Sequence, residues 1–186
     1  MTTTAVLPAA PPAASLRNLY YVRFGFAIVW ASLMVVVGKS IGPVSATLIV
    51  LYPLFDAAAA VVDLRSSRTA RLTAGLYFNT ALSLLTAVGL AVALTSGIPG
   101  VLRVWGVWAI TAGLVQLVVA IRRYRLGGQW PMILSGGISV FAGANFIRES
   151  AAPDGTLATV AGYAVLGGIF FLISALRLHS VAKKGN

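Results

Sequence analysis

One hydrophobic run without a charged residue constrains the fold of this chain most strongly. It extends from Val104 to Ile121, roughly eighteen positions, and a membrane-spanning helix needs about 20. A basic loop follows at 122–131 (RRYRLGGQWP), and a second hydrophobic run, richer in small residues, extends from Met132 to Ile147. Because this second run is shorter, we expect it to lie against other helices rather than in bare lipid. The pattern predicts a helical hairpin in a membrane.

The composition favours lipid over water as the main surroundings of the chain. Of its 186 residues, 59% are hydrophobic and only 10% are charged, whereas about a quarter of a soluble domain is charged. The net charge is +10, but the basic residues lie between hydrophobic runs rather than on one face interleaved with aromatic residues. We therefore expect the lipid bilayer, and no nucleic acid, as partner. Cysteine is absent, which excludes a disulfide framework, a thiolate nucleophile and a cysteine metal site.

Hydrophobic runs and polar loops alternate along most of the chain and predict an all-α membrane protein with six transmembrane helices. We expect a disordered, Pro-rich tail at 1–18, a six-helix transmembrane domain at 19–178 and a basic C-terminal tail at 179–186. The helices are expected at about 22–38, 44–62, 72–94, 104–121, 132–147 and 157–176.

The positive charges predict how the helices are oriented. If the N-terminus is inside, every Lys and Arg except Lys39, Arg103 and Arg148 falls on the inner side. Arg17 and Arg23, which precede the first hydrophobic run, belong to that inner set. Because short loops rich in Lys and Arg stay in the cytoplasm, we predict a multi-pass protein of the cell membrane with both termini cytoplasmic.

A weak repeat groups the helices in pairs. When the fourth and sixth predicted helices are aligned, Trp108 falls on Tyr163 and Gly113 on Gly168, and the second predicted helix fits less closely, with Tyr52 and Ala57 at these positions. The spacing of about 55 residues equals two helices per unit and predicts a bundle of three repeated helical hairpins. All three would enter the membrane from the same side, as parallel repeats do.

These hairpins resemble a known family. Each has an aromatic residue, a small residue (glycine in two of the three) near mid-helix and an arginine close to the end, and the fifth helix begins with WPMILSGGISVFAG (Trp130 to Gly143). The chain is similar to the HdeD family of small, short-repeat bacterial inner-membrane proteins over most of residues 20–178. The resemblance implies a six-helix bundle and a role in acid resistance or another stress response. It supplies no catalytic residues.

Small residues recur at four-residue spacing on two predicted helices, which places them on one helix face. Such faces allow helices to approach closely in lipid; the alternative is a narrow polar pathway along the same faces. The residues expected in helix packing are Gly75, Ser83, Ala87, Gly113, Ser135, Ser139, Gly143 and Gly168.

Asp56 is the sharpest single feature, because a carboxylate within the hydrocarbon costs at least about 2.5 kcal/mol and therefore seeks partners inside the bundle. Counted from the basic loops, Asn79 and Gln116 lie at a similar depth. We expect a polar intramembrane cluster of Asp56, Asn79 and Gln116. Its members either hold three helices in register or handle protons or ions.

The sequence favours a membrane protein without enzymatic activity, metal or cofactor. The single histidine, His179, lies in the basic C-terminal segment with no acidic residue near it, and no nucleophile–base pair is visible. The favoured function is that of an HdeD-type protein in acid or envelope stress tolerance. The alternative is a small proton-coupled transporter or channel that uses Asp56. Six short helices around a thin core are also compatible with a homo-oligomer.

Overall fold

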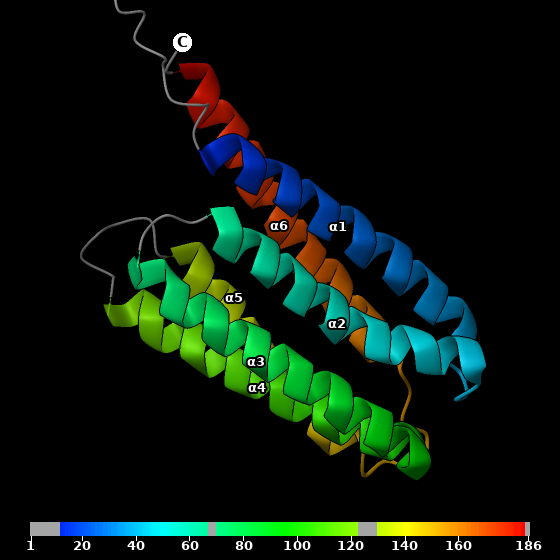
Figure 1. The fold of residues 1–186 in the computed structure, drawn as a ribbon. Helices are drawn as coiled ribbons and strands as arrows, with labels where there is room; N and C mark the ends of the chain where they lie inside the picture. The colour runs from blue at the N-terminus through cyan, green and yellow to red at the C-terminus, as the bar shows by residue number, and fades with distance from the viewer. Residues whose placement is uncertain (1–11, 67–69, 123–129, 185–186) are drawn as a thin grey trace, which may run out of the picture.

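The chain folds into a bundle of long helices, and the start of the first helix lies beside the end of the last (Figure 1). The computed structural model describes residues 12–66, 70–122 and 130–184. A short 3-10 helix, η1 (Leu94–Ser96), joins the third and fourth α-helices, and the described ranges contain no strand. The α-helices within these ranges are α1 (Pro12–Val37), α2 (Pro43–Ser66), α3 (Ala70–Ala93), α4 (Gly97–Arg122), α5 (Trp130–Glu149) and α6 (Ala158–Lys184).

The helices are long and apolar enough to cross a membrane. Large apolar side chains are displayed on the outer surface, with Leu85 71% exposed and Phe141 78% exposed. A soluble monomer rarely exposes so much continuous apolar surface, whereas a helix in lipid satisfies its backbone internally and can turn such side chains outward. The candidate spans are Ser15–Val37, Pro43–Arg65, Ala74–Val118, Trp130–Glu149 and Ala158–Ser180. The chain therefore has the architecture of an α-helical, multi-pass membrane protein.

Several helices are longer than the sequence predicts. α1 begins at Pro12 rather than near residue 22, because proline suits the first helical turn, where its missing N–H is not needed. Residues 12–18 of the predicted disordered tail are thus helical, and residues 1–11 lie outside the described residues. α4 begins at Gly97, whose φ of +71° makes the turn that leads into it. α6 continues to Lys184 through most of the predicted basic tail.

Three helix pairs form the most extensive contacts: α4 with α5, α1 with α6, and α2 with α3. α1 with α2 and α3 with α4 form smaller contacts, and α5 with α6 the smallest of these, so the helices follow one another around the bundle in chain order. Each extensive contact joins an odd-numbered helix to an even-numbered one. A two-helix unit repeated three times around an axis would produce this arrangement; the repeat itself stays a prediction.

Glycines bring α4 and α5 together along their length. A Cβ on Gly106 would lie 2.7 Å from the Gly143 carbonyl oxygen, and a Cβ on Gly143 would lie 2.6 Å from the Gly106 carbonyl oxygen. One heptad further along, Gly113 and Gly136 face each other in the same way, at 2.7 and 2.9 Å. No larger residue fits at these four positions without moving a backbone. The two helices therefore pack through backbone against backbone.

The other small residues expected in packing lie in different surroundings. A Cβ on Gly168 of α6 would lie 3.1 Å from the Ala27 Cβ of α1, and Ser83 and Ala87 are buried on α3. Ser135 is half-buried. Gly75 lies on an exposed face near the start of α3, where a Cβ would meet nothing within 4 Å. No helix of the described part of the chain approaches closely at that point, so Gly75 does not serve the contact expected of it.

The core of the bundle is aromatic. Trp30 of α1 is 1% exposed, and its indole Nε1 donates a hydrogen bond of 2.7 Å to the Leu48 carbonyl oxygen of α2. Its ring centroid lies 4.6 Å from that of Tyr52 and 5.5 Å from that of Trp105. Trp108 completes the cluster, with its ring centroid 5.7 Å from that of Trp105. Tyr52 and Trp108, which the predicted repeat aligns, thus contact each other in the core at 6.1 Å.

Candidate functional site

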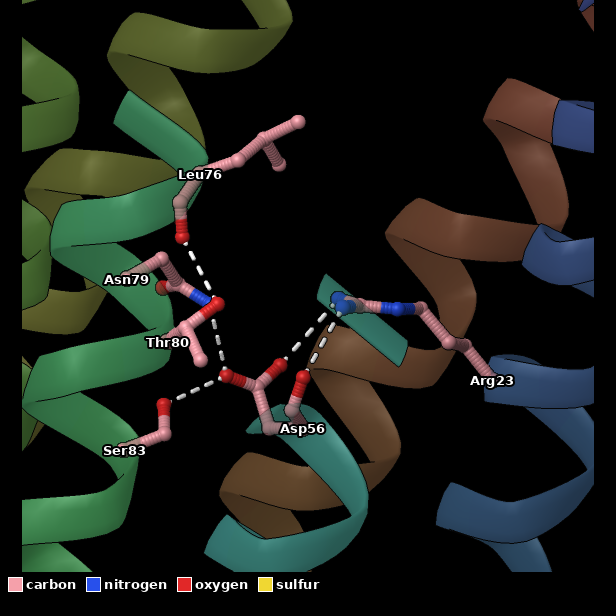
Figure 2. Close-up of polar contacts among 6 residues, drawn as sticks. All are labelled: Arg23, Asp56, Leu76, Asn79, Thr80 and Ser83. Atoms are coloured by element: carbon pink, nitrogen blue, oxygen red, sulfur yellow. Dashed lines mark hydrogen bonds and ion pairs between the residues drawn. The ribbon is translucent and has the colours of Figure 1, made fainter. Parts of the chain in front are cut away.

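A charged cluster lies where α1, α2 and α3 meet. Asp56 lies on α2 one residue beyond Phe55, in the turn that follows Pro53. Arg23 comes from α1, and Asn79 and Ser83 lie one turn apart on α3, so both side chains face the same way. Figure 2 shows these three side chains pointing toward the Asp56 carboxylate. We call Arg23, Asp56, Asn79 and Ser83 the Asp56 cluster.

Both carboxylate oxygens of Asp56 are occupied. Arg23 Nη1 lies 3.1 Å from Asp56 Oδ1 and forms an ion pair with it. Asp56 Oδ2 accepts two hydrogen bonds, one of 2.9 Å from Asn79 Nδ2 and one of 2.7 Å from Ser83 Oγ (Figure 2). Charge-assisted hydrogen bonds of this kind are about twice as strong as neutral ones. The carboxylate therefore connects three helices.

Arg23 extends these connections to a fourth helix. Its Nη2 donates to the Asp56 backbone carbonyl oxygen at 3.4 Å, and its Cζ lies 4.8 Å from the centroid of the Phe171 ring on α6. A guanidinium over an aromatic face is attracted by the ring quadrupole. Arg23 Nε is buried and has no hydrogen-bond partner in the part of the chain that the structure describes.

The cluster is largely withdrawn from the surface and carries no net charge. The Arg23 side chain is 13% exposed and the Asp56 side chain 20% exposed. One guanidinium balances one carboxylate, so the helices hold a neutral polar group inside a mostly apolar bundle. A buried pair of this kind adds little over an apolar replacement, but removing one partner is costly because the other is left uncompensated.

The structure brings together two of the three residues expected in the polar cluster. Asp56 and Asn79 are hydrogen-bonded, whereas Gln116 donates from Nε2 to the Met132 carbonyl oxygen of α5, at 3.0 Å. Gln116 faces α5, the main packing partner of α4, so its amide is used there. Ser83, expected only in packing, also donates a hydrogen bond to the carboxylate. Arg23 was missed, because its place before the first hydrophobic run marked it as a charge that sets topology.

A second polar contact joins α5 to α6. Ser139 Oγ and Tyr163 Oη lie 3.0 Å apart, and the Tyr163 ring packs edge-on against Phe146, with ring centroids 5.7 Å apart. Ser139 is one of the expected packing residues, and its hydroxyl is buried with the tyrosine. The contact connects the two sequential helices that touch least.

The remaining candidate, His179, lies on the exposed end of α6. Its Nδ1 is 3.4 Å from Arg17 Nη1, so the early part of α1 lies beside the last part of α6. Across residues 12–66, 70–122 and 130–184, no three His, Asp or Glu side chains are grouped as metal ligands.

Comparison with known proteins provides no family for this chain: no family model, no curated protein and no solved structure matches it. The class is defined by the candidate spans alone, as a multi-pass α-helical membrane protein.

Proposed function

We propose that this chain is a non-enzymatic, six-pass integral membrane protein of the HdeD type that contributes to tolerance of acid or envelope stress. Six passes are supported by the candidate span Ala74–Val118. Its 45 residues would extend roughly 68 Å as one helix, about twice the hydrocarbon thickness. The short helix η1 separates α3 from α4 within this span and the two helices contact each other, which supports two passes rather than one.

The observation that carries the proposal is the occupied carboxylate of Asp56. Its partners come from α1 and α3 and engage both oxygens. This arrangement favours a structural role, in which the carboxylate holds the helices together (a tie between helices), over a site for a solute. Such a tie keeps the bundle assembled, and an envelope protein that serves under acid must stay assembled there. The resemblance of the hairpins to HdeD proteins supports the same role.

A small proton-coupled transporter is the second candidate, and one feature favours it. The Arg23 and Asp56 side chains keep 13% and 20% of their surface exposed, so a proton could reach the carboxylate. A proton on Asp56 would remove the charge that attracts Arg23, and α1 would lose its polar contact with α2. Ionisable side chains inside membrane-spanning segments are common members of the proton relays of pumps and transporters.

Three measurements with one variant test the proposal. Asp56→Asn should lower survival of an acid shock when it replaces the wild-type gene, and should also lower the resistance of the purified protein to unfolding. In liposomes, neither wild type nor variant should carry a proton flux above that of protein-free liposomes. Asp154→Asn, in the exposed turn before α6, is the control.

Other outcomes separate the candidates. If the wild type carries a proton flux and Asp56→Asn abolishes it, the protein is a proton-coupled transporter, and the purely structural role of Asp56 is wrong. Survival that is unchanged when the gene is deleted would contradict the stress role, whatever the flux.

A further inference from the structure

An apolar groove lies between α3 and α4, and its lining includes no residue of the Asp56 cluster. Its volume is about 320 Å³, within the range of sites that hold small molecules. The walls are formed by Leu82, Leu85 and Thr86 of α3 and by Val104, Val107 and Trp108 of α4. Leu85 and Val107 are 71% and 57% exposed, so the groove opens on the outer surface of the bundle.

The groove is apolar even at its hydroxyl. Thr86 Oγ1 donates a hydrogen bond of 2.8 Å to the Leu82 carbonyl oxygen of its own helix. The donor of this hydroxyl is therefore used within α3, and a ligand in the groove need not offer it a hydrogen-bond acceptor. A hydrocarbon chain loses no polar contact by lying here, and it gains dispersion contacts with both helices.

A single charge marks one end of the groove. Arg103, the remaining lining residue, lies near the start of α4 and is exposed. Val104, Val107 and Trp108 follow it toward the middle of α4, so the groove extends from the charged end into the apolar part of the bundle. Trp108 lies five residues after Arg103, or about 7.5 Å along the helix.

Arg103 keeps donors for a further acceptor. Its Nε donates to Ser150 Oγ at 3.3 Å, and no acidic side chain within the described ranges forms a salt bridge with it. A guanidinium has five N–H groups in a planar fork, and the four on its two terminal nitrogens suit a phosphate group bidentately.

We infer that this groove binds an anionic phospholipid. One acyl chain would lie along Leu85, Val107 and Trp108, and the headgroup phosphate would accept hydrogen bonds from Arg103. Both features are needed: a free phosphate has no chain for the groove, and a lipid without a phosphate offers no acceptor to the guanidinium. Since Arg103 is the only charged residue among the described lining residues, no acidic side chain there would pair with the cation of a zwitterionic headgroup, and a lipid with a net negative headgroup is preferred.

The inference is tested by lipid-dependent stability of the full-length protein in a neutral detergent. Phosphatidylglycerol should raise the unfolding temperature at lower concentration than phosphatidylcholine, and soluble glycerol phosphate should have no effect. Arg103→Gln should require about tenfold more phosphatidylglycerol for the same shift. Val107→Phe, which fills the groove and keeps the charge, should lose the shift as well. Arg148→Gln is the matched control, because Arg148 is an exposed arginine that pairs with Asn145 and is not among the lining residues of this groove.

Three results would overturn the inference. The first is an equal shift of the unfolding temperature by both lipids in wild type. The second is a full phosphatidylglycerol shift of the unfolding temperature in Val107→Phe. This second result can be obtained even if Arg103→Gln does not fold. The third is concentration-dependent dimerisation that Val107→Phe abolishes without any dependence on lipid, which would place a second copy of the chain in the groove.

Discussion

Arg23 and Asp56, which form the ion pair between α1 and α2, are equally distant in sequence from the turn at Lys39 and Ser40. In an antiparallel hairpin, residues that are equally far from the turn lie at the same level. The charge in the first span and the charge in the second are therefore opposite each other. Neutralisation across the hairpin explains why the bundle can contain both.

Removing the Asp56 carboxylate should destabilise the protein markedly. Asp56→Asn leaves the Arg23 guanidinium largely buried without its counter-charge, and breaking a buried pair from one side costs about 3 kcal/mol. SDS titration of the protein in mixed micelles, followed by helical circular dichroism, measures the loss. Asp154→Asn should shift the midpoint little, because Asp154 is exposed. Equal midpoints for Asp56→Asn and wild type would show that the cluster contributes nothing.

Removing both charges should be less harmful than the two single changes suggest. The Arg23→Gln and Asp56→Asn double variant contains no uncompensated charge, so its destabilisation should be smaller than the two single values added together. The same SDS titration on four proteins completes a double-mutant cycle. Strict additivity would mean that the two groups do not interact.

Filling the contact between α4 and α5 should disrupt the bundle. Gly143→Leu places a side chain where even a Cβ meets the Gly106 carbonyl oxygen at 2.6 Å, and overpacking of this kind costs about 1–3 kcal/mol or more. Gly137→Leu is the matched control, because it lies on the same helix and a Cβ there meets nothing within 4 Å. Size-exclusion profiles and SDS midpoints of the two variants should differ clearly. A normal profile and midpoint for Gly143→Leu would show that the two backbones are further apart.

Deleting the Tyr163 hydroxyl should weaken the contact between α5 and α6. Tyr163→Phe keeps the ring beside Phe146 but removes the partner of the Ser139 hydroxyl, and one such hydrogen bond contributes about 1 kcal/mol. Amide exchange in α5 and α6 should rise relative to α2 and α3. The result would contradict this account if exchange rose equally in all helices.

Labelling of introduced cysteines tests which side each end occupies. The chain has no cysteine, so single substitutions at exposed positions report without background. Ser180→Cys, at the end of α6, should resist a membrane-impermeant maleimide in intact cells, whereas Ser40→Cys, in the turn after α1, should react. The opposite pattern would place the termini outside and refute the charge rule for this protein.

Much of the helical plan is visible in the sequence, because apolar runs and basic loops report directly on lipid and water. Similar depth is visible too: Asp56 and Asn79 lie at nearly equal distances in sequence from the loop between α2 and α3, and they are hydrogen-bonded. The direction in which a side chain faces is harder to predict. Gln116 lies at the expected depth on α4 but faces α5.

Where a helix ends, and which other helix it packs against, depend on tertiary contacts that the hydrophobic pattern of the sequence does not reveal. Proline suits a helix start at Pro12 but does not require one there; the first part of α1 gains its support from α6, the most distant helix in sequence, through the contacts of Arg17 with His179 and of Tyr20 with Phe171. Arg23 was interpreted as a charge that sets topology, because an expected helix start near residue 22 left it at the boundary of the span. Its contact with Phe171 could not be inferred without knowing that α1 packs on α6.

The packing of α1 on α6 has a consequence for how the protein is made. α1 gains its largest contact only when α6 has been synthesised. Until then the Arg23 guanidinium relies on Asp56 of α2, and the side of α1 that will meet Gly168 stays open to lipid or to an insertion factor. Assembly of the bundle therefore waits for α6, and a truncated chain that lacks α6 should be recognised as unfinished.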